Sequence, residues 1–202
     1  MCSRDAGRRL ARRPRTLTLG TYGHMHPSMS EPADLALSLA DRIGHGAFGD
    51  IFAPASGQQA IKVFRRLNDC MMGHVAPHVF RAETDALRIA SAHPILSRHT
   101  PKYHGELKIR RVENEAGEDI SKEYWLELAY AMERIAPDPE ERKVGSFYSP
   151  DEWHLMKSLV DIFEAAGIKH VGDASALHWQ TGHPVIIDFG CSDAAADHAR
   201  LD

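Results

Sequence analysis

Three glycines and a lysine form the pattern in this chain that most clearly indicates chemistry. Gly44, Gly46 and Gly49 follow the spacing G-x-G-x-x-G, and Lys62 follows in an apolar run. A glycine loop lets backbone N–H groups approach phosphate oxygens closely, because no Cβ obstructs the approach. A lysine ammonium neutralises phosphate charge. The pattern therefore indicates a phosphate-binding site.

The same glycine spacing also opens the helix of a dinucleotide-binding fold, so the residues that follow decide between two structures. After Gly49 the chain reads Asp-Ile-Phe-Ala-Pro, which has no helical period and favours a strand and a turn. Residues 58–66 predict a second, buried strand, because β-branched and aromatic residues surround Lys62. We therefore expect a glycine loop between two strands, with Lys62 on the second of them.

Acidic side chains stand where phosphate chemistry would need them. Residues 78–90 have helical period, and Glu83 lies within the apolar face of that predicted helix. A carboxylate among core positions is costly unless it is paired, so we expect an ion pair between Glu83 and Lys62, with Asp85 as the competing acid. The alternative for Glu83 is a surface position at the edge of the helix. Asp188 ends an apolar run, where a carboxylate suits a divalent cation.

These motifs resemble those of the protein kinases. That family shows G-x-G-x-x-G-x-V, then V-A-I-K, and later D-F-G. The matching residues are Gly44 to Ile51, Ala60-Ile61-Lys62 and Asp188-Phe189-Gly190. The resemblance implies an α+β, bilobal protein kinase-like fold. An antiparallel N-lobe sheet and the helix αC would precede a reduced, mostly helical C-lobe. We expect a disordered basic leader over residues 1–30, the kinase N-lobe over residues 31–136, and the truncated C-lobe over residues 137–202.

The resemblance implies that ATP and Mg²⁺ are the cofactors. In protein kinases the lysine, held by the helix glutamate, contacts the phosphates, and the D-F-G aspartate binds Mg²⁺. The predicted strand before residue 134 resembles the strand that enters the kinase hinge. Met132 would be the gatekeeper, and Glu133 and Ile135 would offer backbone groups to the adenine edge. The residues implied to bind ATP are Gly44, Gly46, Ala47, Phe48, Gly49, Ile51, Ala60, Lys62, Met132, Glu133 and Ile135.

Asp173 resembles the catalytic-loop aspartate that accepts the proton of the attacking hydroxyl. The family motif is H-R-D-x-x-x-x-N, but Val171 and Gly172 replace its His and Arg, and His178 stands at the Asn position. A neutral imidazole can bind Mg²⁺ but prefers softer ions, so His178 is either a metal ligand or a hydrogen-bond partner of Asp173. The resemblance implies that the catalytic residues are Asp173, Lys62 and Glu83, and that the metal ligands are Asp188 and His178.

Few residues follow Gly190, and an activation segment of normal length is missing. This architecture resembles the minimal kinases that some bacteria deliver into host cells as effectors. It implies an ATP- and Mg²⁺-dependent protein kinase that phosphorylates a Ser or Thr hydroxyl of a specific target protein, with a host chaperone such as Hsp90 as an example of a partner. The alternatives are a small-molecule phosphotransferase and a nucleotide-binding pseudokinase that acts as a binding module.

The composition of the chain limits its expected partners and its expected location in the cell. The chain has 202 residues, 43% of them hydrophobic, and a net charge of −4, so nucleic acid is not an expected partner. Its three cysteines show no metal or disulfide spacing. No apolar run approaches membrane-spanning length, so we expect a soluble protein without membrane contact. We also expect a monomer. It would act either in a host cell after secretion or in the cytoplasm; the arginine-rich leader is compatible with export.

Further elements must position these residues. Residues 102–113 and 123–134 predict two strands joined by the polar turn 114–119. Ser149-Pro150 followed by Glu152 predicts the start of a helix, because Ser is a preferred N-cap and Pro suits the first helical position. An apolar stripe continues along that helix, which would be the central helix of the second lobe.

Overall fold

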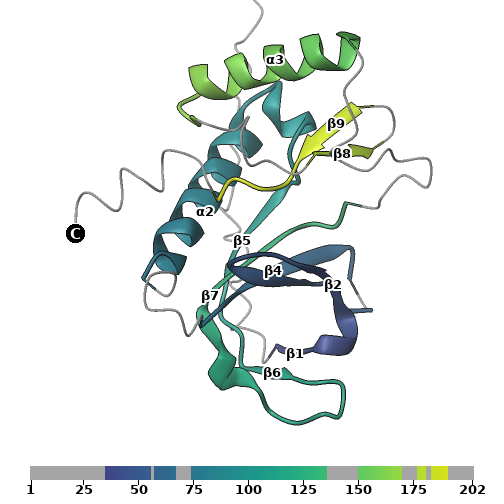
Figure 1. The fold of residues 1–202 in the computed structure, drawn as a ribbon, viewed down its shortest axis with the longest axis vertical. Coiled ribbons are helices and arrows are strands. Elements are labelled where there is room, and N and C mark those ends of the chain that lie inside the picture. The colour runs from purple at the N-terminus through teal and green to yellow at the C-terminus, as the bar shows by residue number, and fades with distance from the viewer. Residues whose placement is uncertain are drawn as a thin grey trace, which may run out of the picture. The chain divides into compact units, whose positions relative to one another are not determined.

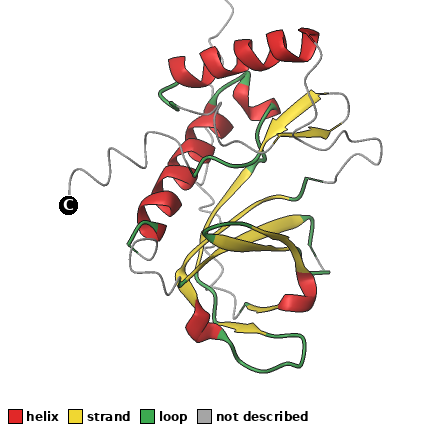
Figure 2. Cartoon of the chain, viewed as in Figure 1, coloured by secondary structure: helices red, strands yellow, loops and turns green. Residues whose placement is uncertain are grey.

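The computed structural model describes residues 35–55, 57–66, 74–135, 150–169, 177–180 and 183–190, with only the backbone at 150–153, 155–156, 177–180 and 183–184. All of these residues belong to the compact unit Pro32–Asp202. The expected leader, residues 1–30, lies outside the described residues, and the division into two lobes stays a prediction. The described chain combines strands and helices with an antiparallel sheet, so the α+β class is confirmed (Figures 1 and 2).

The main sheet has five strands in the order β2-β3-β4-β7-β5, and every neighbouring pair is antiparallel. Their bounds are Arg42–His45 for β2, Gly49–Phe52 for β3, Gln59–Arg65 for β4, Tyr124–Glu133 for β7 and Tyr103–Leu107 for β5. Short β1, Ala36–Ser38, pairs in parallel with β6, Arg111–Glu113. The 3₁₀ turns are Leu39–Asp41, Leu96–Arg98 and Ser121–Glu123.

Strand β4 lies at the centre of the sheet and sorts its side chains between two faces. Ala60 and Phe64 join one hydrophobic cluster, whereas Ile61 and Val63 join a second cluster on the opposite face. Lys62 stands directly opposite Ile51 on β3 and Tyr130 on β7. The predicted buried strand around Lys62 is thereby confirmed.

The single strand predicted over residues 102–113 is wrong. The chain forms β5, leaves the sheet after Leu107, and resumes as β6 beside β1. Ile109 and Val112 are fully buried in the second cluster together with Leu37, and the backbone N–H of Arg110 donates to Leu35. The interruption places Ile109 and Val112 in the second cluster, where their burial stabilises the departure from a single strand.

Of the two described helices, one packs on the Lys62 face of the sheet, and the other contacts the 3₁₀ turn Leu96–Arg98. Helix α2, Ala76–Ala92, extends beyond the predicted 78–90 and buries one face that includes Val79, Leu87 and Glu83. Helix α3, Pro150–Ala165, begins at the predicted proline. After α3 come the paired strands β8, Leu177–Gln180, and β9, His183–Ile186. In the described ranges, no helix has the length and apolarity that crossing a membrane requires.

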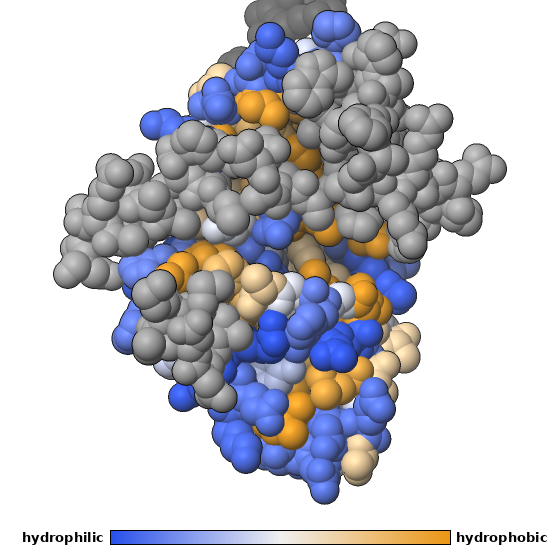
Figure 3. Space-filling model, viewed as in Figure 1, coloured by the Kyte–Doolittle hydropathy of each residue, from blue (hydrophilic) through white to orange (hydrophobic). Residues whose placement is uncertain are grey.

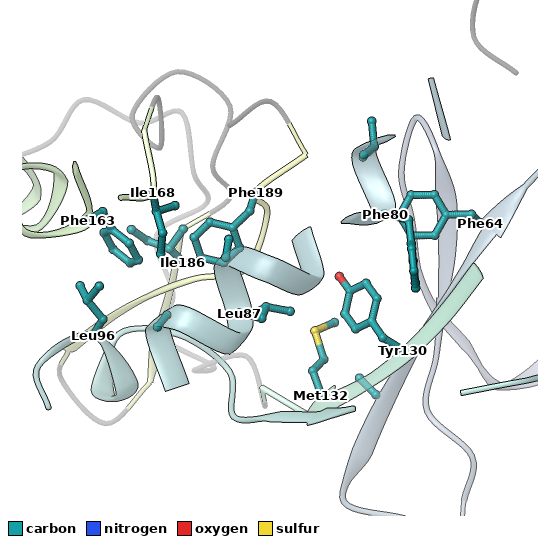
Figure 4. Packing of buried hydrophobic residues seen from close by; sticks show 14 of the residues in the cluster. Phe64, Phe80, Leu87, Leu96, Tyr130, Met132, Phe163, Ile168, Ile186 and Phe189 are labelled. Carbon is teal, nitrogen blue, oxygen red and sulfur yellow. The ribbon is translucent and has the colours of Figure 1, made fainter. Parts of the chain in front are cut away.

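The larger hydrophobic cluster connects the sheet to the later elements. Figure 4 shows Phe64, Phe80 and Tyr130 at one end of this cluster and Phe163 and Phe189 at the other, with part of α2 between them. The backbone N–H of Ile186 donates to His99, which ties β9 to the segment after α2. The core therefore determines where the residues after β9 lie relative to α2 and β4.

Candidate functional site

The glycine loop joins two strands, as its sequence context predicts, but Lys62 lies on the next strand, β4, and not on the second strand of the loop, because Gly49–Phe52 forms a strand of its own. Gly44 lies on β2, Gly49 begins β3, and the N–H of Gly46 donates to the carbonyl of Gly49 at 2.9 Å. A Cβ at Gly49 would stand 2.5 Å from the backbone oxygen of Val63, so only glycine permits this approach to β4. Because no helix follows the third glycine, a dinucleotide fingerprint is excluded.

Lys62 and Glu83 form the expected ion pair. The Lys62 Nζ donates to the Glu83 Oε1 at 2.5 Å, and the two side chains are only 11% and 2% exposed. Asp85, the competing acid, pairs with Arg88 on the exposed side of α2 instead. The apolar face of α2 places Glu83 inward, which explains why the surface alternative for Glu83 fails.

Tyr130 binds the second oxygen of the same carboxylate. Its hydroxyl donates to the Glu83 Oε2 at 2.8 Å. Burial raises the pKa of Tyr130, and the neighbouring Glu83 carboxylate raises it further, so the phenol stays protonated and remains a donor. Burial also raises the pKa of Glu83, while the Lys62 ammonium lowers it. Sequence reasoning missed Tyr130, although its register position opposite Lys62 would identify it once the strands are aligned.

Asp188-Phe189-Gly190 lies against this ion pair. A Cβ built on Gly190 would stand 2.9 Å from the Glu83 Oε1 and 3.0 Å from the Val79 side chain. The N–H of Gly190 donates to the Asp188 Oδ1 at 3.0 Å, and the Asp188 charge raises the pKa of Glu83. Phe189 is buried against Phe163, with ring centroids 5.8 Å apart. The structure therefore brings the region of Asp188 to the carboxylate that holds Lys62.

The residues expected near adenine lie on neighbouring strands. Ala60 and Met132 stand opposite each other on β4 and β7, and both are buried in the larger cluster. Glu133 ends β7, where its N–H donates to Lys102, and Ile135 follows two residues later. Ile51 and Phe48 are half-buried and pack against the same cluster, whereas Ala47 is exposed in the turn. The adenine contacts themselves stay a prediction.

Two expected residues cannot be placed in the site. Asp173 lies outside the described residues. His178 is on β8 opposite Val185, and its side chain is also outside the description. Among the side chains that the structure describes, no group of three or more His, Cys, Asp or Glu stands ready to hold a metal. The assignments of Asp173 and His178 therefore stay predictions.

Comparisons with known proteins do not place the chain in a family, since no family model and no curated protein matches it. The kinase resemblance therefore stays a prediction that rests on the residues of this chain. The described geometry bears on that prediction through the glycine loop, Lys62, Glu83 and the segment at Asp188.

Proposed function

We propose that this protein is an ATP- and Mg²⁺-dependent protein kinase with a bilobal kinase-like fold. The observation that carries the proposal is the buried ion pair between Lys62 and Glu83. Lys62 lies on β4, which pairs with the strand that follows the glycine loop, and the segment of Asp188 lies against the pair. A lysine fixed in this way keeps its ammonium in one position, which suits it to bind phosphate oxygens. A buried salt bridge often adds little to the stability of a fold, because removing both charges from water is costly. A role in orienting a ligand gives the Lys62–Glu83 pair a function beyond stability.

Each residue has a role that follows from its chemistry. The backbone N–H groups of the glycine loop cover the phosphates, and Lys62, oriented by Glu83, neutralises oxygens of the α- and β-phosphates. Asp173 orients the attacking hydroxyl and accepts its proton. These roles need positioning and charge stabilisation more than covalent chemistry by the protein.

Asp188 fits a magnesium ion by the chemistry of its oxygens. Its carboxylate is half-buried, and the N–H of Gly190 orients one oxygen at 3.0 Å. Mg²⁺ commonly takes one or two protein carboxylates and completes its shell with phosphate oxygens and water, so a large cluster of acids is not required. When bound, the ion supplies positive charge to the phosphates. His178 is the second ligand that we propose.

The acceptor that we propose is a Ser or Thr hydroxyl of a specific protein, and the setting is a host cell into which the protein is delivered. The kinase motifs of the chain support this choice through their resemblance to minimal effector kinases. Two other results would contradict a protein acceptor. One is transfer of phosphate to a small molecule, and the other is nucleotide binding without any transfer.

The first experiment measures nucleotide binding to the full chain by calorimetry with ATP and Mg²⁺. We expect Lys62→Met to weaken binding by about tenfold or more, because a charge-assisted contact to phosphate is lost. Lys108→Met is the matched control, since it removes the same charge from an exposed position. Equal affinities of the two variants would contradict the site, and an absence of binding by the unaltered chain would contradict the proposed function.

The second experiment follows label from γ-labelled ATP into a eukaryotic lysate. We expect Asp173→Ala to keep nucleotide affinity and to lose about 10²–10⁴-fold in transfer rate, as the loss of a general base implies. Undiminished transfer would contradict the role of Asp173. Label in a metabolite would indicate a small-molecule phosphotransferase, and binding without any transfer would indicate a pseudokinase.

A further inference from the structure

A second charged network lies on the face of the sheet opposite Lys62. Its centre is Asp50 on β3, which is 1% exposed and stands opposite Val63. The Tyr124 hydroxyl donates to the Asp50 Oδ2 at 2.6 Å, and the His45 Nδ1 lies 2.6 Å from the Oδ1. The guanidinium of Arg65 approaches the same carboxylate at 4.0 Å. Asp50 therefore joins side chains from three neighbouring strands.

Arg65 binds all three carbonyl groups of the glycine turn. Its guanidinium Nη2 donates to the oxygen of Gly46 at 2.5 Å and approaches that of Ala47 at 3.3 Å. Its backbone N–H donates to the oxygen of Phe48 at 2.8 Å. One residue on the strand that carries Lys62 thus receives the negative ends of three successive peptide dipoles.

This arrangement has a consequence for the opposite side of the turn. In a trans peptide the N–H points away from the C=O, and the described chain contains no cis peptide. With the carbonyls of Gly46 and Ala47 bound to Arg65, the N–H groups of Ala47 and Phe48 point away from its guanidinium. A turn that directs carbonyls to a cation on one side leaves its amide hydrogens for an anion on the other.

We propose that Arg65, held in place by Asp50, is a positioning residue that aligns the glycine turn so that its amide N–H groups face a phosphate. The phosphate is that of the nucleotide, and this part of the inference rests on the proposed function. Arg65 acts only through the backbone of the turn, from the face away from Lys62.

Asp50 restrains Arg65 by charge. The Arg65 Nε is buried and makes no hydrogen bond within the described residues, so the nearby carboxylate is its electrostatic partner. Arg42 on β2 also lies 3.9 Å from Asp50, which balances the buried negative charge with a second cation. His45 ties the β2 end of the turn to the same carboxylate. The turn is consequently held at its start by His45 and along its carbonyls by Arg65.

The test compares Arg65→Met with Arg81→Met, an exposed arginine on α2 that serves as the matched control. The first readout is the ¹⁵N order parameter of Ala47 and Phe48 in the full chain without nucleotide. We expect rigid values of about 0.85 in the unaltered chain and in Arg81→Met, and values below about 0.6 in Arg65→Met. Order parameters in α2 should not change. Unchanged values at the turn would overturn the inference, and so would an equal loss of order throughout the chain.

The second readout is the ratio of affinities for a non-hydrolysable ATP analogue with Mg²⁺ and for adenosine. We expect Arg65→Met to lower the analogue affinity by about tenfold and to leave adenosine binding unchanged, since adenosine has no phosphate for the turn to bind. A loss that is equal for both ligands would overturn the phosphate assignment.

A second variant keeps the inference testable if Arg65→Met does not fold. Asp50→Asn preserves the shape of the side chain but removes the charge that restrains Arg65, so it should raise mobility at the turn in the same way. If the turn loosens but the unaltered chain binds no nucleotide, the positioning role of Arg65 stands and the proposed function fails. If the unaltered chain binds nucleotide but the turn is unaffected in both variants, the proposed function stands and the positioning role of Arg65 fails.

Discussion

The carboxyl group of Glu83 is almost fully buried, and side chains from two strands bind its oxygens. Removing a carboxylate from water costs several kcal/mol, and the Lys62 ammonium and the Tyr130 hydroxyl offset that cost. The nearby Asp188 charge acts in the unfavourable direction, because it raises the pKa of Glu83. Among the groups around Glu83, the Lys62 ammonium therefore does most to stabilise the charged carboxylate.

We expect Lys62→Met to make the stability of the protein fall as pH rises. Without the ammonium, burial and the Asp188 charge raise the pKa of Glu83 further above its ordinary 4.5. The folded state then binds a proton that the unfolded state has released. The free energy of unfolding should therefore be highest below pH 4.5, fall as the pH rises above that value, and level off beyond the folded pKa.

Urea denaturation at about pH 5 and about pH 8 measures this effect. The double variant Lys62→Met with Glu83→Gln is the control, because it lacks the titrating carboxyl group. Identical pH dependence in the single and double variants would show that Glu83 does not carry the effect.

Contacts between whole elements place the glycine turn. Strand β3 approaches β4 so closely at Gly49 that a Cβ would stand 2.5 Å from a backbone oxygen, which no side-chain rotation can relieve. The same pairing brings Arg65 to the turn and Lys62 to the other face. The pairing of β3 with β4 thus serves both charged networks.

We expect Gly49→Ala to separate the two strands and to destabilise the protein by about 1–3 kcal/mol, as overpacking typically does. Gly57→Ala is the matched control, since its Cβ would find its nearest neighbour at an ordinary 3.6 Å. The measurement is the midpoint of thermal unfolding of both variants. Equal midpoints would mean that β3 can shift without loss.

At the scale of the whole described molecule, one cluster joins the sheet, α2 and the elements after residue 150. Phe189 belongs to that cluster and is buried, so the position of the neighbouring Asp188 depends on packing far from Lys62. The large exposed hydrophobic residues among those described are Ile43 on β2, Ile89 on α2, and Val75 and Ile95, which each precede a helical segment. On the face drawn in Figure 3, hydrophobic residues likewise lie among hydrophilic ones.

We expect Phe189→Ala to destabilise the protein by about 3–5 kcal/mol, the usual cost of removing a buried phenylalanine. It should also remove the Asp188 carboxylate from its place beside Glu83. Ile89→Ala, at a position 40% exposed on α2, is the control and should cost far less. Chemical denaturation of both variants gives the comparison, and similar losses would show that Phe189 is not a core residue.

Much of the fold follows from local patterns. The apolar stripe of α2, the strand around Lys62 and the glycine loop between strands are each encoded within a short stretch of chain. The pairing of Glu83 with Lys62 was also predictable, because an acid on an apolar helix face needs a partner. The bend after Leu107 was not predictable, since it depends on a parallel pairing of β6 with the distant β1.

The residue types of the proposed phosphate site and the strands and helix that carry them are encoded locally in the chain. Tyr130 as the second partner of the Glu83 carboxylate, and Arg65 as the partner of the glycine turn, become evident only from the folded arrangement. These partners are 47 and 19 residues apart along the chain. Periodicity reports the face on which a side chain lies, but not which distant side chain it meets there, because strand order and register bring the two together.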